Sequence, residues 1–301
     1  MAQAAALTDC KTLAGTDVLQ WRRTQLARGG AAVDLDWLLD LAGGVSWATL
    51  QRLLLDPSRT IAMVQPLDEL TELWERHLQE NVPLQHLVGL CPWRDLLLES
   101  SPAALIPRQE TELLVDLALT RFKDDQPRRW ADLGTGSGAI AVSLSRAWPT
   151  ASGHAVDLSP DALWLAERNL QRCAPSHHCS LHLGSWWTPL KGLWGTLDLV
   201  VSNPPYIPLP VLHGLEPVVR DHEPRLALSG GHDGLDAIRA VVEGAPKGLA
   251  PGGWLLLEHH HDQSSLVLKL MRDVGLMDVS AAKDLEGIRR FAIARNPSAT
   301  S

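Results

Sequence analysis

The most specific chemistry in this chain lies in one tetrapeptide, Asn203-Pro204-Pro205-Tyr206, which contains its only tyrosine. It follows an apolar run at 197–202 that predicts a strand. The prolines restrict the backbone, so the Asn203 carbonyl oxygen and the Pro204 backbone oxygen lie at a fixed separation. Two such acceptors can hold both hydrogens of a planar NH₂ group and direct its lone pair at an electrophile, while Tyr206 stacks on that group. Asn and Pro also end strands in ordinary turns.

A glycine-rich turn predicts the second half of a site. The apolar strand expected at 129–133 leads into Gly134-Thr135-Gly136-Ser137-Gly138, and helical apolar spacing begins at Ala139. Glycines let the backbone approach a ligand, and the helix N-terminus offers free N–H groups. Asp157 ends the next expected strand, where its carboxylate can accept both hydroxyls of a ribose. Together these features predict an adenosine site.

The glycine turn by itself leaves two cofactor classes open. Gly134-x-Gly136-x-x-Ala139 also satisfies the pattern of nicotinamide dinucleotide sites. The pair of acceptor oxygens on Asn203 and Pro204, which we call the NH₂ clamp, decides between the two cofactor classes. A dehydrogenase does not need such a clamp, whereas methyl transfer to nitrogen does. We therefore predict S-adenosyl-L-methionine as the cofactor, with S-adenosyl-L-homocysteine as the product.

The surrounding pattern predicts the elements that position these residues. After residue 107, strands and helices alternate, which predicts an α/β domain whose parallel sheet has helices on both faces. The first helix is expected at 109–122. Strands are expected at 129–133, 153–157, 179–183, 197–202 and 253–258, with an antiparallel pair at 276–282 and 288–295. Ligands in such sheets bind beyond the carboxyl ends of the strands, where the polar residues above would converge.

The first 84 residues predict a separate helical bundle. Helices are expected at 17–28, 34–42, 46–55 and 67–80, with Asp34 and Ser46 as N-caps and a Gly43-Gly44 stop. One apolar stripe is expected to be core: Leu67, Leu70, Leu73, Trp74 and Leu78. Segments 85–89 and 95–99 predict a β-hairpin arm. We therefore expect domains at 1–84, 85–106 and 107–301.

Composition and charge restrict the class of protein. At 301 residues and 45% hydrophobic, the chain is long enough for one large domain and a smaller one. The apolar runs are far shorter than a membrane span and the N-terminus lacks a signal-peptide pattern, so we expect no membrane partner and a cytoplasmic location. Residues 1–80 carry seven Lys and Arg against eleven Asp and Glu, and the whole chain has a net charge of −8, which disfavours a nucleic-acid partner.

Cysteine and histidine clusters do not predict a metal site. The scattered cysteines show no Cys-x-x-Cys spacing, which is typical of a reducing compartment: Cys10, Cys91, Cys173 and Cys179. His177-His178 lies near two of them, and His259-His260-His261 forms a triplet. Neither group has the paired spacing of a structural zinc site, so we expect no metal.

Further motifs follow one another in order along the chain. They are Leu-Ile-Pro-Arg-Gln-Glu-Thr-Glu at 105–112, Glu-Pro-Arg-Leu-Ala-Leu at 223–228, Gly-Gly-His-Asp-Gly-Leu-Asp at 230–236 and Pro-Gly-Gly-Trp-Leu-Leu-Leu-Glu at 251–258. With the glycine turn and the Asn-Pro-Pro-Tyr motif, they make residues 85–295 resemble the PrmC/HemK-like methyltransferases. That family methylates the glutamine in the Gly-Gly-Gln loop of peptide chain release factors. Asn-Pro-Pro-Tyr alone is shared with adenine methyltransferases, whereas the segments around Arg108, Glu223 and Gly230 are more specific to the glutamine enzymes.

The resemblance implies a class I, Rossmann-like methyltransferase domain with a small N-terminal helical bundle and a β-hairpin arm. It implies methylation of glutamine N5 in class 1 release factors, which the N-terminal domain would dock; we expect a monomer. The expected catalytic residues are Asn203, Pro204 and Tyr206, and substrate contacts also include Pro205, Arg108 and Glu110. The expected cofactor contacts are Gly134, Thr135, Gly136, Ser137, Gly138, Asp157, Leu158, Trp186 and Asn203.

Three departures from the family pattern stand out. Gln109 replaces the usual Pro. An Asp that meets the adenine amino group in the family is replaced within Gly184-Ser185-Trp186-Trp187, so we move the adenine contact to Trp186, with Ser185 as the weaker candidate. His259-His260-His261 replaces the usual Ile-Gly-His, which puts a bulky residue where the family has a small one.

The mechanism expected is direct in-line methyl transfer, without a covalent enzyme intermediate or a strong general base. Glu110 and Glu112 could accept the proton, or could stabilise a helix start. Three alternatives remain open: a glutamine methyltransferase for a ribosomal protein, an adenine-N6 methyltransferase for nucleic acid, and a protein that binds the cofactor without turnover. The acidic charge disfavours the nucleic-acid enzyme, and the complete clamp disfavours the binding protein.

Overall fold

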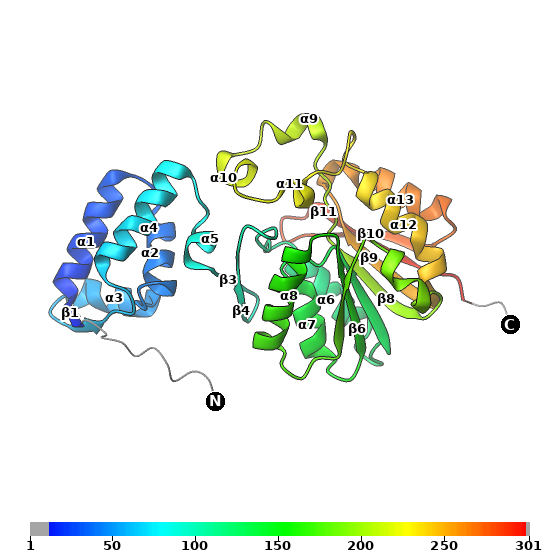
Figure 1. Ribbon diagram of the computed structural model, residues 1–301, viewed down its shortest axis with the longest axis horizontal. Helices are drawn as coiled ribbons and strands as arrows, with labels where there is room; N and C mark the ends of the chain where they lie inside the picture. Colours follow the sequence, from blue (N-terminus) through cyan, green and yellow to red (C-terminus); the bar gives the residue numbers. More distant parts are fainter. Residues whose placement is uncertain (1–11, 299–301) are drawn as a thin grey trace. The chain divides into compact units, whose positions relative to one another are not determined.

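The computed structural model describes residues 12–298, which form two compact units (Figure 1). One unit ends at Leu90 and the other begins at Cys91. Cys10 lies outside the described residues, whereas Cys91, Cys173 and Cys179 are free thiols. Across the described range, every helix is too short or too polar to cross a membrane.

The first unit is a helical bundle with a short two-stranded sheet. Its elements are β1 (Thr12–Ala14), α1 (Gly15–Arg28), α2 (Ala32–Leu41), α3 (Trp47–Leu55), β2 (Thr60–Ala62), α4 (Leu67–Glu80) and α5 (Leu84–Val88). The sequence predicts α1 to α4 but not the β1–β2 pair, because three-residue strands are too short to show alternation. The expected core stripe is confirmed: Leu70 and Trp74 are fully buried, and Leu67, Leu73 and Leu78 pack against them.

Helix starts in this unit confirm one expected N-cap and correct another. Ser46 precedes α3, and its hydroxyl accepts a hydrogen bond from the Thr49 backbone N–H at 3.2 Å. Asp34 is not an N-cap, because α2 already begins at Ala32 and places Asp34 in the first turn. A carboxylate there still stabilises the helix through its dipole.

The strand expected at 85–89 is wrong. This segment forms the helix α5, which follows Pro83 and ends at Gly89 in the left-handed region (φ 73°). A proline before a first turn and a glycine after the last one favour a short helix over a strand. The hairpin instead consists of β3 (Leu90–Trp93) and β4 (Leu96–Glu99).

The hairpin is held against the helix α6 (Glu112–Arg121) through its turn residue, Arg94. The Arg94 backbone N–H donates to Glu112 Oε1 at 3.0 Å, and its guanidinium pairs with Asp116 at 2.8 Å. Helix α6 begins three residues later than expected, because residues 109–111 form a turn that precedes it. Glu112 thus serves the hairpin contact at this helix start.

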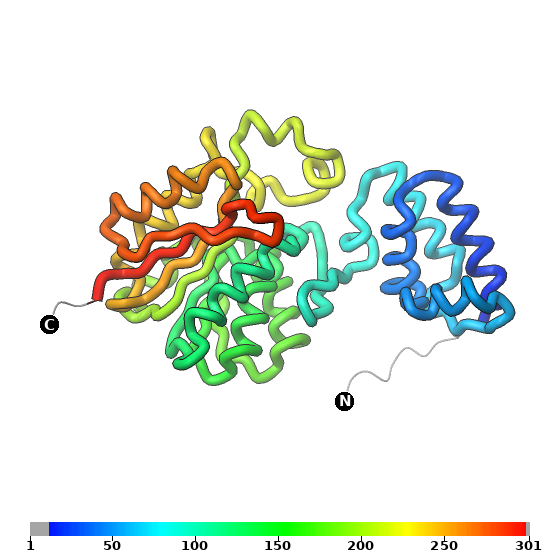
Figure 2. The backbone as a smooth tube through the Cα atoms, turned by 180° about the vertical axis from the view of Figure 1, so that it is seen from behind, coloured from blue at the N-terminus to red at the C-terminus, as the bar shows by residue number. Residues whose placement is uncertain are grey.

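A seven-stranded sheet forms the centre of the second unit, in the order β10-β11-β9-β8-β5-β6-β7. Its strands are β5 (Arg129–Leu133), β6 (Ser152–Asp157), β7 (Cys179–Leu183), β8 (Leu197–Ser202), β9 (Leu249–Glu258), β10 (Met277–Lys283) and β11 (Arg289–Arg295). Strands β5 to β9 pair in parallel, and β11 pairs antiparallel with β9 and β10 (Figure 2). The expected parallel sheet with a final antiparallel pair is therefore confirmed.

Helices cover both faces of this sheet, as predicted. Helices α6, α7 (Ala139–Ala147) and α8 (Pro160–Cys173) lie on one face, and α12 (Asp236–Gly248) and α13 (Ser264–Asp273) lie on the other (Figure 1). Each layer buries its own hydrophobic cluster against the strands. The remaining short helices are α9 (Leu209–Leu212), α10 (Pro217–Arg220), α11 (Arg225–Leu228), η1 (Thr188–Leu193) and η2 (His261–Gln263).

Candidate functional site

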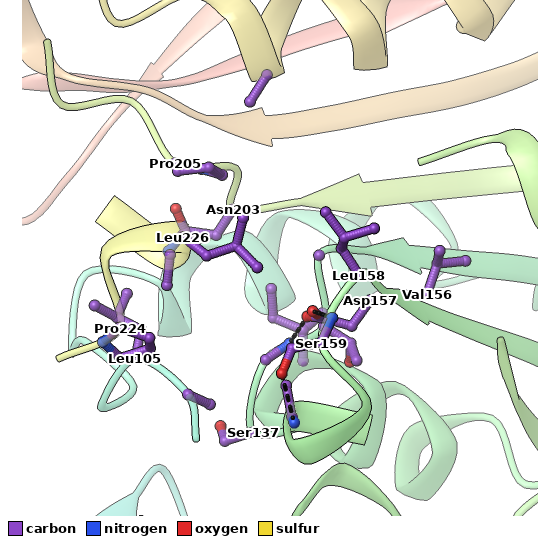
Figure 3. Close-up of a pocket in the computed structure, with 18 of the residues that line it drawn as sticks. Leu105, Ser137, Val156, Asp157, Leu158, Ser159, Asn203, Pro205, Pro224 and Leu226 are labelled. Carbon is purple, nitrogen blue, oxygen red and sulfur yellow. Dashed lines mark hydrogen bonds between the residues drawn. The ribbon is translucent and has the colours of Figure 1, made fainter. Parts of the chain in front are cut away.

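A pocket of about 500 Å³ lies where β5, β6 and β8 end, and it belongs entirely to the second unit. Figure 3 shows Asn203, which follows β8, and Asp157, which ends β6, lining this same pocket. Because parallel strands deliver their carboxyl ends to one edge, residues distant in sequence meet there. The expected site residues that line the pocket are Arg108, Gly134, Thr135, Gly136, Ser137, Asp157, Leu158, Ser185, Trp186, Asn203 and Pro205.

The glycine turn between β5 and α7 lies against this pocket with three residues in the left-handed region. Gly134, Gly136 and Gly138 have φ values of 77°, 56° and 81°, which non-glycine residues adopt at a cost. Gly138 does not line the pocket; it precedes α7, and a Cβ there would lie 3.0 Å from Ala166 of α8. Its role in this structure is therefore close packing of the two helices, while Gly134 and Gly136 face the pocket.

Two carboxylates support the glycine turn. Asp157 accepts from the Gly136 N–H at 2.8 Å through one oxygen and from the Ser159 N–H at 2.9 Å through the other. Asp132 is fully buried beneath the turn and accepts from the Thr135 hydroxyl at 2.7 Å. Burial raises the pKa of Asp132 to about 7, against the hydrogen bond from Thr135, and the nearby Asp157 charge adds to the rise.

The tryptophan pair after β7 divides between pocket and core. Trp186 lines the pocket with φ 48°, and its ring lies against Gly134, where an added Cβ would meet it at 3.3 Å. Trp187 instead turns inward, is 6% exposed and donates from its indole nitrogen to the Val241 backbone oxygen at 2.9 Å. Of these two residues, Trp186 is the aromatic side chain available to a planar ligand.

Asn203 is oriented by a hydroxyl from another element. Its side-chain nitrogen donates to the Thr111 hydroxyl at 3.0 Å, which directs the amide oxygen away from Thr111. The strand before it is anchored as well, because the Ser202 hydroxyl donates to the Leu133 backbone oxygen at 2.7 Å. Among the other expected contacts, Pro204 and Tyr206 do not line the pocket, and Tyr206 packs against the core beside it.

Glu258, at the end of β9, supports the site by contacting Thr111, which lines the pocket, and the sequence alone predicts no role for it. Its carboxylate accepts from the Thr111 hydroxyl at 2.7 Å and from the Tyr206 hydroxyl at 3.3 Å. Burial raises the pKa of Glu258 to about 7, with the two hydrogen bonds opposing the rise. Burial and Glu258 in turn raise the pKa of Tyr206. The signal in the sequence was an acid at the end of an apolar strand. Only the strand order of the folded sheet places it beside β8, which Asn203 follows.

An ion pair joins two of the segments that line the pocket. Arg108 pairs with Glu223 at 2.6 Å, and the second Glu223 oxygen accepts from the Ile106 N–H at 3.3 Å. Burial raises the pKa of Glu223, while Arg108 opposes the rise. Glu110, expected as a substrate contact, is exposed and does not line the pocket.

The histidine clusters form hydrogen bonds of their own. His177 accepts from the Cys179 N–H at 3.1 Å, and His260 pairs with Asp262 at 2.6 Å. Between residues 12 and 298, histidine, cysteine and acidic side chains do not gather into any group that could hold a metal ion.

Comparisons with known proteins find a matching family model and relatives that cover nearly the whole chain. The family model described as the methyltransferase small domain matches residues 109–208. The chain is 56% identical over 283 residues to a release factor glutamine methyltransferase of Prochlorococcus marinus, covering 93% of this chain and 97% of that protein. It is 38% identical over 299 residues to a protein of the same name from Synechocystis sp., covering 95% and 98%.

One solved structure shares the fold at low sequence identity. The catalytic domain of hMettl16, in complex with MAT2A 3'UTR hairpin 6, aligns with a TM-score of 0.54 at 13% identity. The alignment covers 79% of this chain and 84% of that one.

Proposed function

This chain belongs to the release factor glutamine methyltransferase family, and we propose that it methylates N5 of the glutamine in the Gly-Gly-Gln motif of peptide chain release factors. The chain has the class I methyltransferase fold and uses S-adenosyl-L-methionine. The orientation of Asn203 at the pocket supports the residue-level mechanism that follows.

The residues around the pocket fit an adenosine-bearing cofactor. Gly134 and Gly136 present a backbone surface without side chains, Asp157 presents a carboxylate to a ribose, and Trp186 presents an aromatic face to adenine. Leu158 and Ser137 would complete the contacts. When bound, the cofactor supplies an electrophilic methyl group on a positively charged sulfur.

The clamp is proposed to act on the substrate carboxamide. The Asn203 amide oxygen and the Pro204 backbone oxygen accept its two hydrogens. Tyr206, which packs beside the pocket rather than lining it, is proposed to reach the amide plane when the substrate is bound. Holding both N–H bonds orients the nitrogen lone pair towards the methyl group, so that transfer is in line and direct. The excess proton leaves during or after transfer, and no strong base is required. Arg108, held by Glu223, is proposed to contact the substrate main chain at the pocket rim.

Residues 1–84 are proposed to dock the release factor. They belong to a compact unit with its own core, and α3 exposes Trp47 and Leu55 by 63% and 88%. Exposed large apolar side chains on one helix are suited to a protein partner. We propose further that the enzyme acts as a monomer in the cytoplasm.

Asn203→Ala tests the clamp. The variant should lose transfer by about 100-fold or more, because oriented hydrogen bonds at the reacting group are lost. Its affinity for S-adenosyl-L-homocysteine, measured by calorimetry, should stay within about twofold if orientation is the main role of Asn203. Wild-type turnover would refute the clamp.

The substrate is tested separately by tritium transfer from labelled cofactor into purified release factor, ribosomal protein and nucleic acid. Peptide mapping should place the label on the glutamine of the Gly-Gly-Gln motif. Label in a ribosomal protein alone would replace the proposed substrate, and label in nucleic acid alone would support an adenine methyltransferase.

A further inference from the structure

A buried chain of hydrogen bonds connects the clamp to one carboxylate. Asn203 follows β8, Thr111 precedes α6 and Glu258 ends β9, so three separate elements contribute to it. The order is Asn203 Nδ2 to Thr111 Oγ1 at 3.0 Å and Thr111 Oγ1 to Glu258 Oε2 at 2.7 Å. Thr111 and Glu258 are 4% and 2% exposed, so bulk water does not compete for these bonds.

The donor-to-acceptor direction of these hydrogen bonds depends on the protonation of Glu258. An ionised carboxylate can only accept, so Thr111 must donate its single hydrogen to it. The Thr111 oxygen then accepts from the Asn203 NH₂ group, and the Asn203 oxygen is turned towards the substrate. A protonated Glu258 can donate to Thr111, which frees the Thr111 hydrogen for the Asn203 oxygen. The amide would then present its NH₂ group to the substrate NH₂, and two donors would face each other.

We propose that Thr111 and Glu258 are positioning residues that fix which end of the Asn203 amide faces the substrate, with ionised Glu258 selecting the productive end. This inference rests on the proposed clamp. Neither residue has to touch the methyl group or the proton that leaves. Thr111 is suited to the role because its hydroxyl does not cap α6, so it is available to hydrogen-bond with Asn203 and Glu258.

The charged and titratable groups around Glu258 make its ionisation accessible near neutral pH. Burial and Glu110 raise the pKa of the carboxyl, whereas Thr111, Tyr206 and Arg290 lower it, and the result is about 7. We therefore expect kcat to rise with pH through about 7 and then level. Because the folded-state pKa is raised, protonation stabilises the fold, and that stabilisation is lost as pH rises through about 7. The fold is thus less stable with Glu258 ionised, the state proposed to be productive, than with Glu258 protonated.

Two substitutions at Thr111 separate orientation from packing. Thr111→Val keeps the shape but places a methyl group against the Asn203 NH₂, so the productive orientation leaves an N–H unpaired. We expect kcat to fall about tenfold or more, with cofactor affinity unchanged. Thr111→Ser keeps the hydroxyl and should restore most of the activity. Equal loss in both variants would indicate a packing role and would contradict the proposal.

Glu258→Gln tests the pH dependence. The glutamine has the same shape and does not titrate, so the limb of the kcat profile near pH 7 should disappear whatever activity remains. Melting at pH 8 should be no lower than in the wild type, because ionising the buried carboxyl opposes folding there. A limb that persists near pH 7 in this variant would assign it to another group and overturn the proposal.

The asparagine side chains give a readout that does not depend on activity. The chain has four asparagines, Asn81, Asn169, Asn203 and Asn296, so ¹⁵N-asparagine labelling gives few side-chain NH₂ signals. Asn203→Ala identifies the signal of interest by its loss. In wild type that signal should shift with a midpoint near pH 7, and the shift should vanish in Glu258→Gln and Thr111→Val. The Asn169 and Asn296 signals serve as internal controls, because both groups donate to backbone carbonyls.

The outcomes distinguish this inference from the clamp itself. Full turnover by Asn203→Ala would refute the proposed clamp. An inactive Asn203→Ala together with a normal Thr111→Val, and an Asn203 signal that does not respond near pH 7, would leave the clamp in place and refute the positioning role alone.

Discussion

Asp157 performs two tasks at once, because the same carboxylate supports the glycine turn and faces the pocket. Each oxygen accepts one backbone N–H, from Gly136 and from Ser159, at 2.8 and 2.9 Å. Carboxylate oxygens have further lone pairs, which leaves capacity for the hydroxyls of a ribose. We propose that the same charge holds the glycine turn and binds the ribose.

Asp157→Asn should weaken cofactor binding by about 10- to 100-fold, because hydrogen bonds to a charged group are replaced and one amide N–H must face a backbone donor. Calorimetry with S-adenosyl-L-homocysteine measures the change. Asp161→Asn, at an exposed position in the first turn of α8, is the matched control and should bind as the wild type does. Equal affinity of the two variants would show that Asp157 does not hold the ribose.

The sequence identified Asn203, Asp157 and Trp186, and the structure brings all three to one pocket. Each lies at the end of a strand or within three residues after it, a position that sequence patterns can indicate. Thr111 and Glu258 were not assigned roles, because their contact joins residues 147 positions apart. Such a contact depends on strand order and on the approach of α6, neither of which leaves a local pattern in the chain. Gly138 was assigned to the cofactor by its motif, although its position in the structure is explained by helix packing.

At the scale of elements, the buried parallel strands were the easiest to predict. Strands β5 and β8 have the predicted bounds, because an apolar run between polar turns defines both ends. The edge strand β7 also has the predicted bounds, although polar residues interrupt it. The helix α5 was predicted as a strand, since five residues cannot distinguish a period of 2 from one of 3.6. The pair β1–β2 was missed for the same reason.

A histidine pair links two strands at the edge of the sheet. His154 on β6 and His182 on β7 share a hydrogen bond of 3.0 Å between Nδ1 and Nε2. Burial, then the nearby His182 and Arg129, lower the pKa of His154 to about 4. Burial also lowers the pKa of His182. Both rings are therefore neutral in the folded protein at neutral pH.

Acid should weaken this strand pair before it affects most carboxylates. Because the folded-state pKa of His154 lies below its usual 6.5, its stabilising contribution is complete above pH 6.5 and is lost as pH falls towards about 4. His154→Gln keeps a hydrogen-bonding side chain without this titration. The stability advantage of the wild type over the variant, from urea unfolding, should shrink as pH falls from 6.5 to 4. A constant difference would show that His154 does not carry the pH dependence.

At the scale of the whole molecule, each cluster of buried hydrophobic side chains lies within one unit. One cluster draws its members from residues 13–88, and the other clusters draw theirs from residue 93 onward. The pocket is built from residues 103–237. A ligand in that pocket therefore contacts the second unit, whereas the Ser46 cap belongs to the first.

Ligand binding and the loss of a cap should consequently act on different parts of the chain. S-adenosyl-L-homocysteine at 100 times its Kd should stabilise the unit that binds it by about 2.7 kcal/mol. Ser46→Ala should destabilise the helical bundle by about 1 kcal/mol. In hydrogen exchange measured by mass spectrometry, the ligand should slow exchange in peptides after Cys91, and the variant should speed it in peptides before Leu90. Uniform protection of both units by the ligand would mean that they unfold together as one cooperative unit, and would contradict this prediction.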